Sequence, residues 1–265
     1  MSIDTTYGFT YKGRHCSELG VRLLRYTVNS PNLREYEDEP AGTPGVIDYG
    51  TELGKREIEI TVDIVPDSRM FKRRQSEILS WLKPTTAAGM LVFDDVPDRF
   101  FTAKLSGNLT PEQIGKYGEL RFAMKCTDPY SRSATLSDNV ILDSTIVLDT
   151  EIRLDDTWSY RIDGTQTVEV NNWGYEDVTP TITITGSCAN LSISAGDKTF
   201  VYSGTLNNET LIVDGERMTV KKGGSSTLQY SDVEFITLEP GINYVTIQGT
   251  TLNCDVSFSF RAKYL

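Results

Sequence analysis

The stretch E-I-E-I-T-V-D-I at residues 57–64 decides the fold class, because its polar and apolar residues alternate with a period of two. Such alternation is typical of an antiparallel strand with one buried face. The stretch E-L-R-F-A-M-K-C at 119–126 alternates in the same way. The two patterns predict half-buried strands in a mainly β protein.

One helical pattern lies between these strands, over residues 68–82. Asp67 or Ser68 is expected to cap its start, and Pro84 follows its end. Its apolar stripe consists of Phe71, Ile78, Trp81 and Leu82. After the helix, the runs L-V-F (91–93) and F-F-T-A-K-L (100–105) predict a hairpin around the turn D-D-V-P-D-R.

Residues 128–138 are the expected seam between two parts, because Pro, Ser and Asp gather there and the apolar periodicity stops. Beyond the seam no helical period appears, and short strand patterns recur between turn residues. This spacing predicts an antiparallel sandwich or jelly roll. The strands expected there are T-I-T-I-T (181–185), L-S-I-S (191–194), K-T-F-V-Y-S (198–203), E-T-L-I-V-D (209–214), R-M-T-V-K-K (217–222), E-F-I-T-L (234–238), N-Y-V-T-I-Q (243–248) and C-D-V-S-F-S-F (254–260).

Residues 29–45 break the strand rhythm with three Pro, two Gly and four acidic side chains. They form either a floppy surface loop or an excursion from the sheet that a partner holds. Ordering each residue costs about 1–2 kcal/mol, whereas burying Leu33 and Tyr36 returns about 2–3 kcal/mol apiece. Local burial therefore cannot order this segment, and we expect it to become ordered only against a second subunit.

The charge balance excludes two classes of partner. The chain of 265 residues has a formal net charge of −11, and residues 131–265 hold 9 basic against 18 acidic side chains. Nucleic acids and anionic membrane surfaces both require clustered Lys and Arg, so neither is an expected partner.

The start of the chain shows no secretory signal, and no run of 18 apolar residues predicts a membrane span. The four cysteines, Cys16, Cys126, Cys188 and Cys254, show no metal-binding spacing and are expected to be free and buried.

The sequence offers little for catalysis. His15 is the single histidine, which rules out a histidine metal cluster and leaves at most one histidine base. Carboxylate pairs occur at 94–95, 155–156 and 176–177, where turns favour acidic residues for local hydrogen bonding. We therefore expect no catalytic residue, no cofactor-binding residue and no metal ligand.

Sugar binding is the alternative function. Trp173, Gly174 and Glu176 match the W-G-x-E core of galectins. However, residues 131–265 contain no histidine, and Val178 stands where the galectin pattern has arginine. Trp173 is therefore expected to be a turn or core residue, and a carbohydrate-binding β-sandwich module remains the second hypothesis.

Two stretches of the chain are distinctive, D-D-V-P-D-R-F-F (94–101) and V-D-G-E-R-M-T-V (213–220). They carry most of a resemblance, over the whole chain, to the distal tail proteins of long-tailed, non-contractile bacteriophages. Further similar stretches in the first half are 9–21, 48–60, 73–82, 93–105 and 128–131. In the second half they are 168–174, 179–186, 211–220, 238–247 and 261–265.

The resemblance implies an N-terminal β-sandwich-like ring domain (1–131) with one helix and a long β-hairpin belt over residues 29–56. It implies a linker (132–150) and a C-terminal galectin-like antiparallel β-sandwich (151–265). The expected function is structural, as a homo-hexameric distal tail hub ring in the virion that joins the tail tube to the adsorption apparatus. Its implied partners are other copies of itself, the tail tube protein and tail-associated, tail fibre or receptor-binding proteins, with assembly in the host cytoplasm.

Overall fold

The protein is described by a computed structural model that covers residues 7–39, 41–42, 44–64, 71–107, 109, 112–114, 117–139, 152 and 156–265. It divides into two compact units, Met1–Ser131 with Leu265 and Arg132–Tyr264. Each unit has its own core of buried apolar side chains. Within these ranges no helix has the length and apolarity that a membrane crossing requires.

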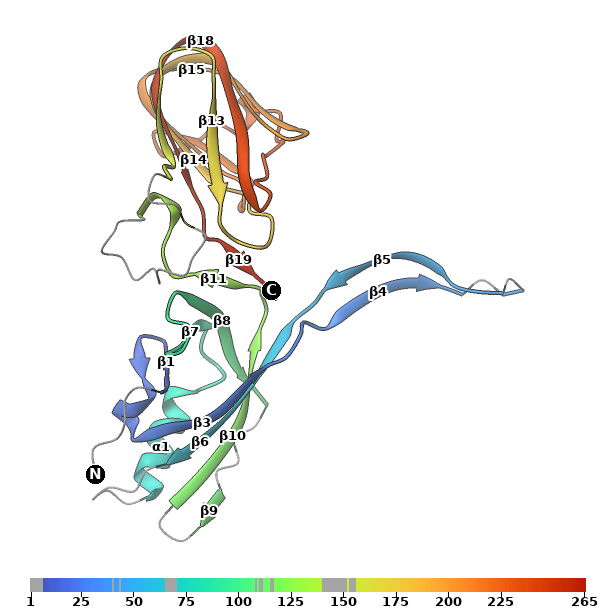
Figure 1. The fold of residues 1–265 in the computed structure, drawn as a ribbon, viewed down its shortest axis with the longest axis vertical. Helices are drawn as coiled ribbons and strands as arrows, with labels where there is room; N and C mark the ends of the chain where they lie inside the picture. Colours follow the sequence, from blue (N-terminus) through green and yellow to red (C-terminus); the bar gives the residue numbers. More distant parts are fainter. Residues whose placement is uncertain are drawn as a thin grey trace. The chain divides into compact units, whose positions relative to one another are not determined.

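The N-terminal unit is built on an antiparallel sheet with the strand order β2-β1-β7-β8-β10-β6-β3 (Figure 1), and β9 pairs with β10. These strands are β1 (Phe9–Tyr11), β2 (Arg14–His15), β3 (Val21–Val28), β6 (Arg56–Ile64), β7 (Gly89–Phe93), β8 (Arg99–Ser106), β9 (Glu112–Ile114) and β10 (Tyr117–Cys126).

Strands β6 and β10 confirm the two alternating patterns that predicted them. The apolar residues of β6 from Ile58 to Ile64 are at most 2% exposed. Ile60 lies opposite Phe122, and Ile58 lies opposite Met124. Residues opposite one another project to the same face, so the apolar sets of both strands meet in one core. The predicted hairpin is also confirmed, because β7 and β8 pair in antiparallel fashion.

Helix α1 (Phe71–Trp81) packs on this core, as its pattern predicted. Ile78 and Leu82 are buried. The Trp81 ring stacks on Phe9 with 5.6 Å between ring centroids, and its Nε1 donates a hydrogen bond to the Tyr11 carbonyl at 3.1 Å. The expected caps at 67–68 and the Phe71 side chain lie outside the described residues.

Gly20 joins the short 3₁₀ helix η1 (Cys16–Leu19) to β3 and lies close to α1. Its φ of +62° is in the left-handed region, and a Cβ there would lie 1.7 Å from Nη1 of Arg74. That same Nη1 donates a hydrogen bond to the Leu19 carbonyl. Only glycine combines this backbone conformation with this approach of the arginine.

Gly20→Ala is expected to lower the free energy of unfolding by more than Gly13→Ala does. Gly13 also has a positive φ, but nothing lies within 4 Å of its Cβ position. Gly13→Ala should therefore cost about 1–2 kcal/mol from backbone conformation alone. Gly20→Ala should cost a further ~1–3 kcal/mol, because it displaces the Arg74 hydrogen bond. Equal losses in denaturant unfolding would contradict the packing of Arg74 against Gly20.

The C-terminal unit is a second antiparallel sheet with the order β12-β18-β14-β15-β16-β17, and β13 also pairs with β18. Three long strands dominate it and close around a common interior (Figure 1). The strands are β12 (Ser159–Ile162), β13 (Gln166–Asn172), β14 (Thr181–Ala195), β15 (Lys198–Asp214), β16 (Thr219–Lys222), β17 (Ser225–Ser226) and β18 (Gly241–Ser259).

The number of strands differs from the sequence prediction. The expected pairs 181–185 with 191–194, 198–203 with 209–214 and 243–248 with 254–260 are each one continuous strand. The strand predicted at 234–238 is wrong. Ile236 and Leu238 are buried, but the segment pairs only through an isolated bridge between Leu238 and Val178. Pro240 follows directly and has no N–H to extend a ladder.

Residues 132–139, which fall in the expected linker, pack on the C-terminal unit. Strand β11 (Ser131–Ser133) pairs with β19 (Lys263–Tyr264), and the Ser133 N–H donates to the Ala262 carbonyl at 2.9 Å. Ser137 is fully buried, and its hydroxyl donates to the Phe258 carbonyl at 2.8 Å. Residues 140–150 lie outside the described ranges.

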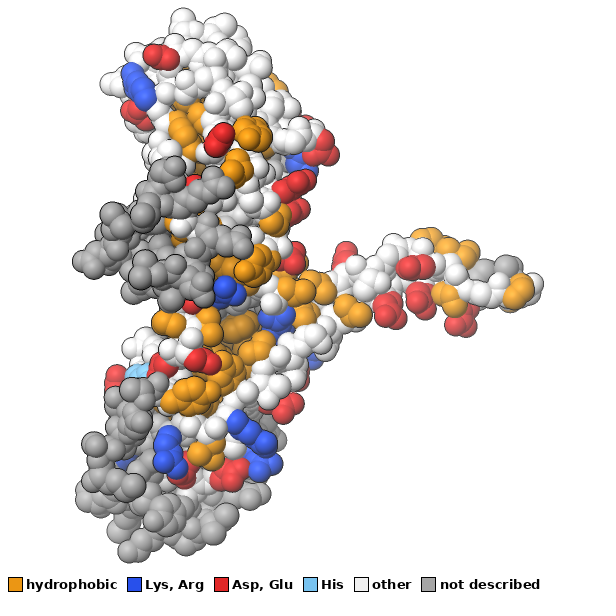
Figure 2. Space-filling view, in the orientation of Figure 1, with side chains coloured by type: hydrophobic (Ala, Val, Ile, Leu, Met, Phe, Trp, Pro, Cys, Tyr) orange, Lys and Arg blue, Asp and Glu red, His pale blue; other side chains and the backbone are white. Residues whose placement is uncertain are grey.

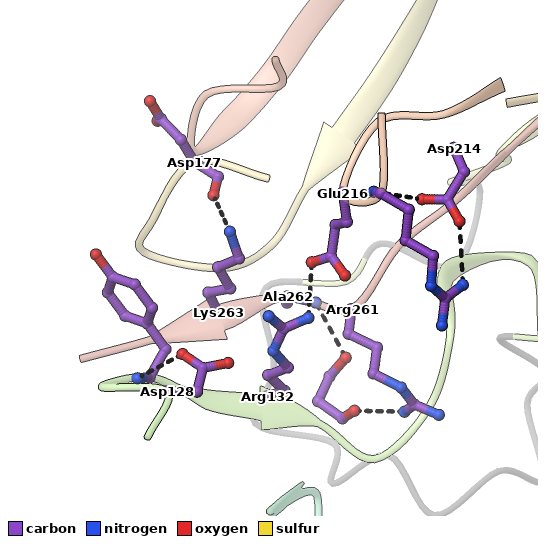
Figure 3. A network of polar contacts seen from close by, with 11 residues as sticks. Asp128, Arg132, Asp177, Asp214, Glu216, Arg261, Ala262 and Lys263 are labelled. Atoms are coloured by element: carbon purple, nitrogen blue, oxygen red, sulfur yellow. Dashed lines mark hydrogen bonds and ion pairs between the residues drawn. The ribbon is translucent and has the colours of Figure 1, made fainter. Parts of the chain in front are cut away.

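Side chains near β19 tighten this junction (Figure 3). Nη1 of Arg261 donates to the Ser133 carbonyl at 2.6 Å, and Nζ of Lys263 donates to the Asp177 carbonyl at 3.1 Å. Arg132 forms an ion pair with Glu216 at 2.7 Å. The first and last strands of the unit are therefore tied to each other and to the loops beside them.

Candidate functional site: the arm of the N-terminal unit

The segment with anomalous composition forms a hairpin, which we call the arm. Strands β4 (Leu33–Asp38) and β5 (Ile47–Leu53) pair with each other in a two-stranded sheet of their own. The arm runs away from the sheet of its unit (Figure 1). The expectation of a long β-hairpin is therefore confirmed, and the alternative of a floppy surface loop is wrong.

The arm exposes large apolar side chains to solvent, which is typical of a surface that contacts another protein. Hydrophobic and acidic side chains follow one another along it (Figure 2). Tyr49 is 67% exposed and Leu33 is 60% exposed. The other large apolar side chains exposed here are Tyr36, Val46 and Ile47. An isolated two-stranded hairpin is marginal in water, and its open edges favour pairing with another chain.

The arm is also strongly acidic. Residues 33–53 hold six acidic side chains and one basic side chain. Arg34 lies opposite Glu52, which is a favourable pairing, but Glu37 lies opposite Asp48. Like charges directly opposite each other destabilise a ladder. The Glu37–Asp48 pair therefore favours a cation from outside the hairpin.

The root of the arm is fastened to β3 and β6 by backbone hydrogen bonds. The Asn29 N–H donates to the Glu57 carbonyl at 3.1 Å, and the Asn32 N–H donates to the Lys55 carbonyl at 2.9 Å. The Gly54 N–H returns a bond to the Asn32 carbonyl at 2.6 Å. The arm therefore continues strands β3 and β6, which lie at one edge of the sheet, and is directed by them.

His15 takes part in a Ser-His-Asp chain that sequence reasoning missed, because Asp94 is far away along the sequence. Its Nδ1 lies 2.6 Å from the Ser17 hydroxyl, and its Nε2 lies 3.0 Å from Asp94 Oδ2. Nδ1 also accepts a hydrogen bond from the Ser17 N–H, so His15 caps η1. A Cβ on Gly8 would lie 2.6 Å from Nε2, so the backbone at Gly8 covers the imidazole. The chain of bonds fastens η1 to the β7–β8 turn, which gives His15 a structural role.

Residues of the other candidate pairs take part in local hydrogen bonds, through the carboxyl groups of Asp95 and Asp156 and through the backbone of Glu176. Asp95 accepts a hydrogen bond from the Tyr26 hydroxyl at 2.5 Å, and Asp156 accepts one from Asn171 at 2.7 Å. The carbonyl of Glu176 accepts a hydrogen bond from Asn172 at 3.0 Å. Asp155 lies outside the described residues. Across the described ranges, no three His, Cys, Asp or Glu side chains gather where they could hold a metal ion.

Trp173 lies in the core of the C-terminal unit, as predicted. It is 4% exposed, and its ring centroid lies 5.2 Å from that of Trp158 and 5.2 Å from that of Phe260. Stacking on a sugar requires an accessible ring face, which Trp173 does not offer.

All four cysteines are buried and free. Burial raises the pKa of Cys126 to about 12, against an opposing effect of Arg56. Cys188 and Cys254 lie side by side in the C-terminal core, where their mutual hydrogen bond raises the pKa of Cys188 and lowers that of Cys254. Buried thiols with a raised pKa are poor nucleophiles, so Cys126 and Cys188 act as small core residues.

Comparison with protein families assigns both units to one class of protein. Residues 14–126 match the family described as the phage tail protein RIFT-related domain. Residues 174–264 match the family described as the siphovirus-type tail component, C-terminal domain. The chain is therefore a structural component of a phage tail. Comparison with curated proteins finds no matching sequence.

The fold is similar to that of a solved tail protein over almost its full length. The crystal structure of SPP1 Dit (gp 19.1), titled a paradigm of the hub adsorption apparatus in Gram-positive infecting phages, matches with a TM-score of 0.73 and 16% identity, covering 98% of this chain and 99% of that chain. The phage P2 baseplate in its activated conformation with Ca matches with a TM-score of 0.42 and 9% identity, covering 95% and 94%. With both family matches in this order, the chain belongs to the siphophage distal tail proteins, which confirms the resemblance.

Proposed function

We propose that this protein forms the distal tail hub of a long non-contractile-tailed phage, as a closed homo-hexameric ring between the tail tube and the adsorption apparatus. The observation that supports this most directly is the arm. It exposes Leu33, Tyr36 and Tyr49, and it pairs with no other described strand of its own chain. A second copy of the chain would cover these apolar side chains and pair with the free strand edges of the arm.

In this proposal the two units have separate roles. The N-terminal domain, residues 1–131, forms the ring through its arm, and the tail tube protein binds the ring. The galectin-like domain, which includes residues 132–139 packed on its strands, carries tail-associated, tail fibre or receptor-binding proteins. The protein has no catalytic role, and assembly takes place in the cytoplasm of the bacterial host.

Native mass spectrometry of the purified chain tests the ring. The ring predicts a discrete species of six chains, because head-to-tail contacts are all satisfied only on closure. A distribution limited to monomer and dimer would reject the ring and favour the carbohydrate-binding module instead. The buried position of Trp173 argues against that alternative.

A further inference from the structure

A cavity of about 190 Å³ lies beside the root of the arm in the N-terminal unit. Its walls include Tyr26, Val28, Arg56, Phe93, Val96 and Arg99. This volume is that of about six water molecules at ~30 Å³ each, which suits a carboxylate and its short stem.

The aromatic wall of the cavity is held in place on both sides. The Tyr26 ring stacks on Phe93 with 3.8 Å between centroids and an interplanar angle of 10°. The Tyr26 hydroxyl donates to Asp95, which fixes the ring against the β7–β8 turn. A preformed wall of this kind loses little conformational entropy when a ligand binds.

Arg56 is the unexplained group of this cavity. Its side chain is 4% exposed, and no described residue accepts a hydrogen bond from its Nε. Its guanidinium lies over the Phe101 ring, with Cζ 5.9 Å from the centroid. Burial lowers the pKa of Arg56, and the nearby Cys126 and Asp128 oppose this effect only in part. A buried guanidinium with an unused donor favours an incoming carboxylate.

The second cationic side chain of the cavity, Arg99, already forms an ion pair with Asp98. Nε of Arg99 lies 3.4 Å from Asp98 Oδ2, in a pair that is partly exposed. Arg99 therefore adds positive charge at the rim, whereas Arg56 offers the unused donor in the interior. The two arginines favour an acidic ligand in an otherwise mostly apolar cavity, and two acidic residues of the arm, Glu37 and Asp48, lie opposite each other.

We propose that this cavity receives a carboxylate of the Glu37–Asp48 pair from the arm of a second copy, with Arg56 as the group that binds it. The protein's own arm cannot supply it, because Val28 and Glu37 are separated by about 30 Å of extended chain leading away from the root. The contact relieves the repulsion between Glu37 and Asp48 and supplies the acceptor that Arg56 lacks. This inference rests on the proposed ring, since each copy both gives an arm and receives one.

A matched pair of substitutions at the rim tests the contact without removing the buried arginine. Val96 lines the cavity and is 38% exposed, so charge can be added there while the fold is retained. Val96→Glu should raise the protein concentration at which half of the chains are assembled by at least about tenfold, because the new negative charge repels the acidic arm. Val96→Lys should assemble as the wild type does or more tightly. Combining Val96→Glu with Glu37→Lys and Asp48→Lys should restore assembly.

A cross-link reports the contact directly. Chains with Val96→Cys are mixed with chains with Asp48→Cys under a mild oxidant, and a disulfide-linked dimer is expected on a non-reducing gel. The native thiols are buried and do not compete. Met218→Cys, an exposed position in the C-terminal unit, replaces Val96→Cys as the control and should give no dimer with Asp48→Cys.

The outcomes separate this inference from the proposed function. If the wild type closes into a ring while all the charge variants assemble equally well and no dimer forms, the ring stands and the acid pair binds elsewhere. If the wild type itself does not assemble, the ring and this contact are both wrong.

Discussion

Replacing residues 33–53 by a Gly-Ser-Gly-Ser linker is expected to give a folded monomer that no longer forms the ring. The described residues of the arm contribute nothing to the buried core of the N-terminal unit. The hydrogen bond between Asn29 and Glu57 lies outside the replaced segment, so the root stays closed. The far-UV spectrum and the unfolding transition should therefore change little, while the oligomer disappears completely.

Light scattering coupled to gel filtration measures this loss. The control carries the same linker inserted between Gly223 and Gly224, in a turn where nothing lies within 4 Å of either Cβ position. That variant should assemble as the wild type does. A shortened arm that still closes into the same oligomer would show that the hairpin plays no part in assembly.

Trp173→Ala is expected to destabilise the C-terminal unit by about 3–5 kcal/mol, as other large-to-small substitutions of buried aromatic residues do. The ring fills the space between Trp158 and Phe260, so its removal leaves a cavity lined by both. The loss is comparable to the whole stability of a marginal domain. Near-UV circular dichroism during denaturant unfolding measures it.

Tyr175→Ala is the control for this substitution. Tyr175 is 59% exposed and meets Tyr264 edge-on with 5.5 Å between centroids, so its loss should cost below ~1 kcal/mol. Equal effects of both substitutions would mean that Trp173 is not a core residue. A glycan array that shows Trp173-dependent binding would restore the carbohydrate-binding hypothesis.

The alternating strands were predictable because their signal is local. A period of two along β6 and β10 reflects one buried face, and no distant residue is needed to recognise it. The helix was predictable from its apolar stripe for the same reason.

The long strands of the C-terminal unit were not predictable from local signals. Residues typical of turns interrupt them, and these residues form bulges within a continuing strand. Asn190 and Asn208 adopt positive φ values of 49° and 53°, and the register of β14 shifts beside Asn190. A residue with positive φ is compatible with either a turn or a bulge, and only the pairing of neighbouring strands distinguishes the two.

The cavity at the root of the arm was also beyond sequence reasoning. Val28, Arg56 and Phe93 come from three separate strands, and none belongs to a motif. The burial of Arg56 and the missing acceptor for its Nε are visible only in the three-dimensional structure, because the amino-acid sequence does not show which side chains are buried. The acidic character of the arm, in contrast, was visible in the sequence before its structure was known.

The pairing of β11 with β19 has a consequence for how this protein can change over time. The C-terminal unit begins and ends on adjacent strands, whose backbones are linked by the hydrogen bond from Ser133 to Ala262. Neighbouring strands lie about 4.8 Å apart. The chain therefore enters and leaves the C-terminal unit at nearly the same place. Closely spaced ends of this kind are the reason that domain insertions are tolerated. The unit is therefore expected to be exchangeable as a block that leaves the arm unchanged, whereas Ser131 and Leu265, at the two points of exchange, also line the cavity beside the root of the arm.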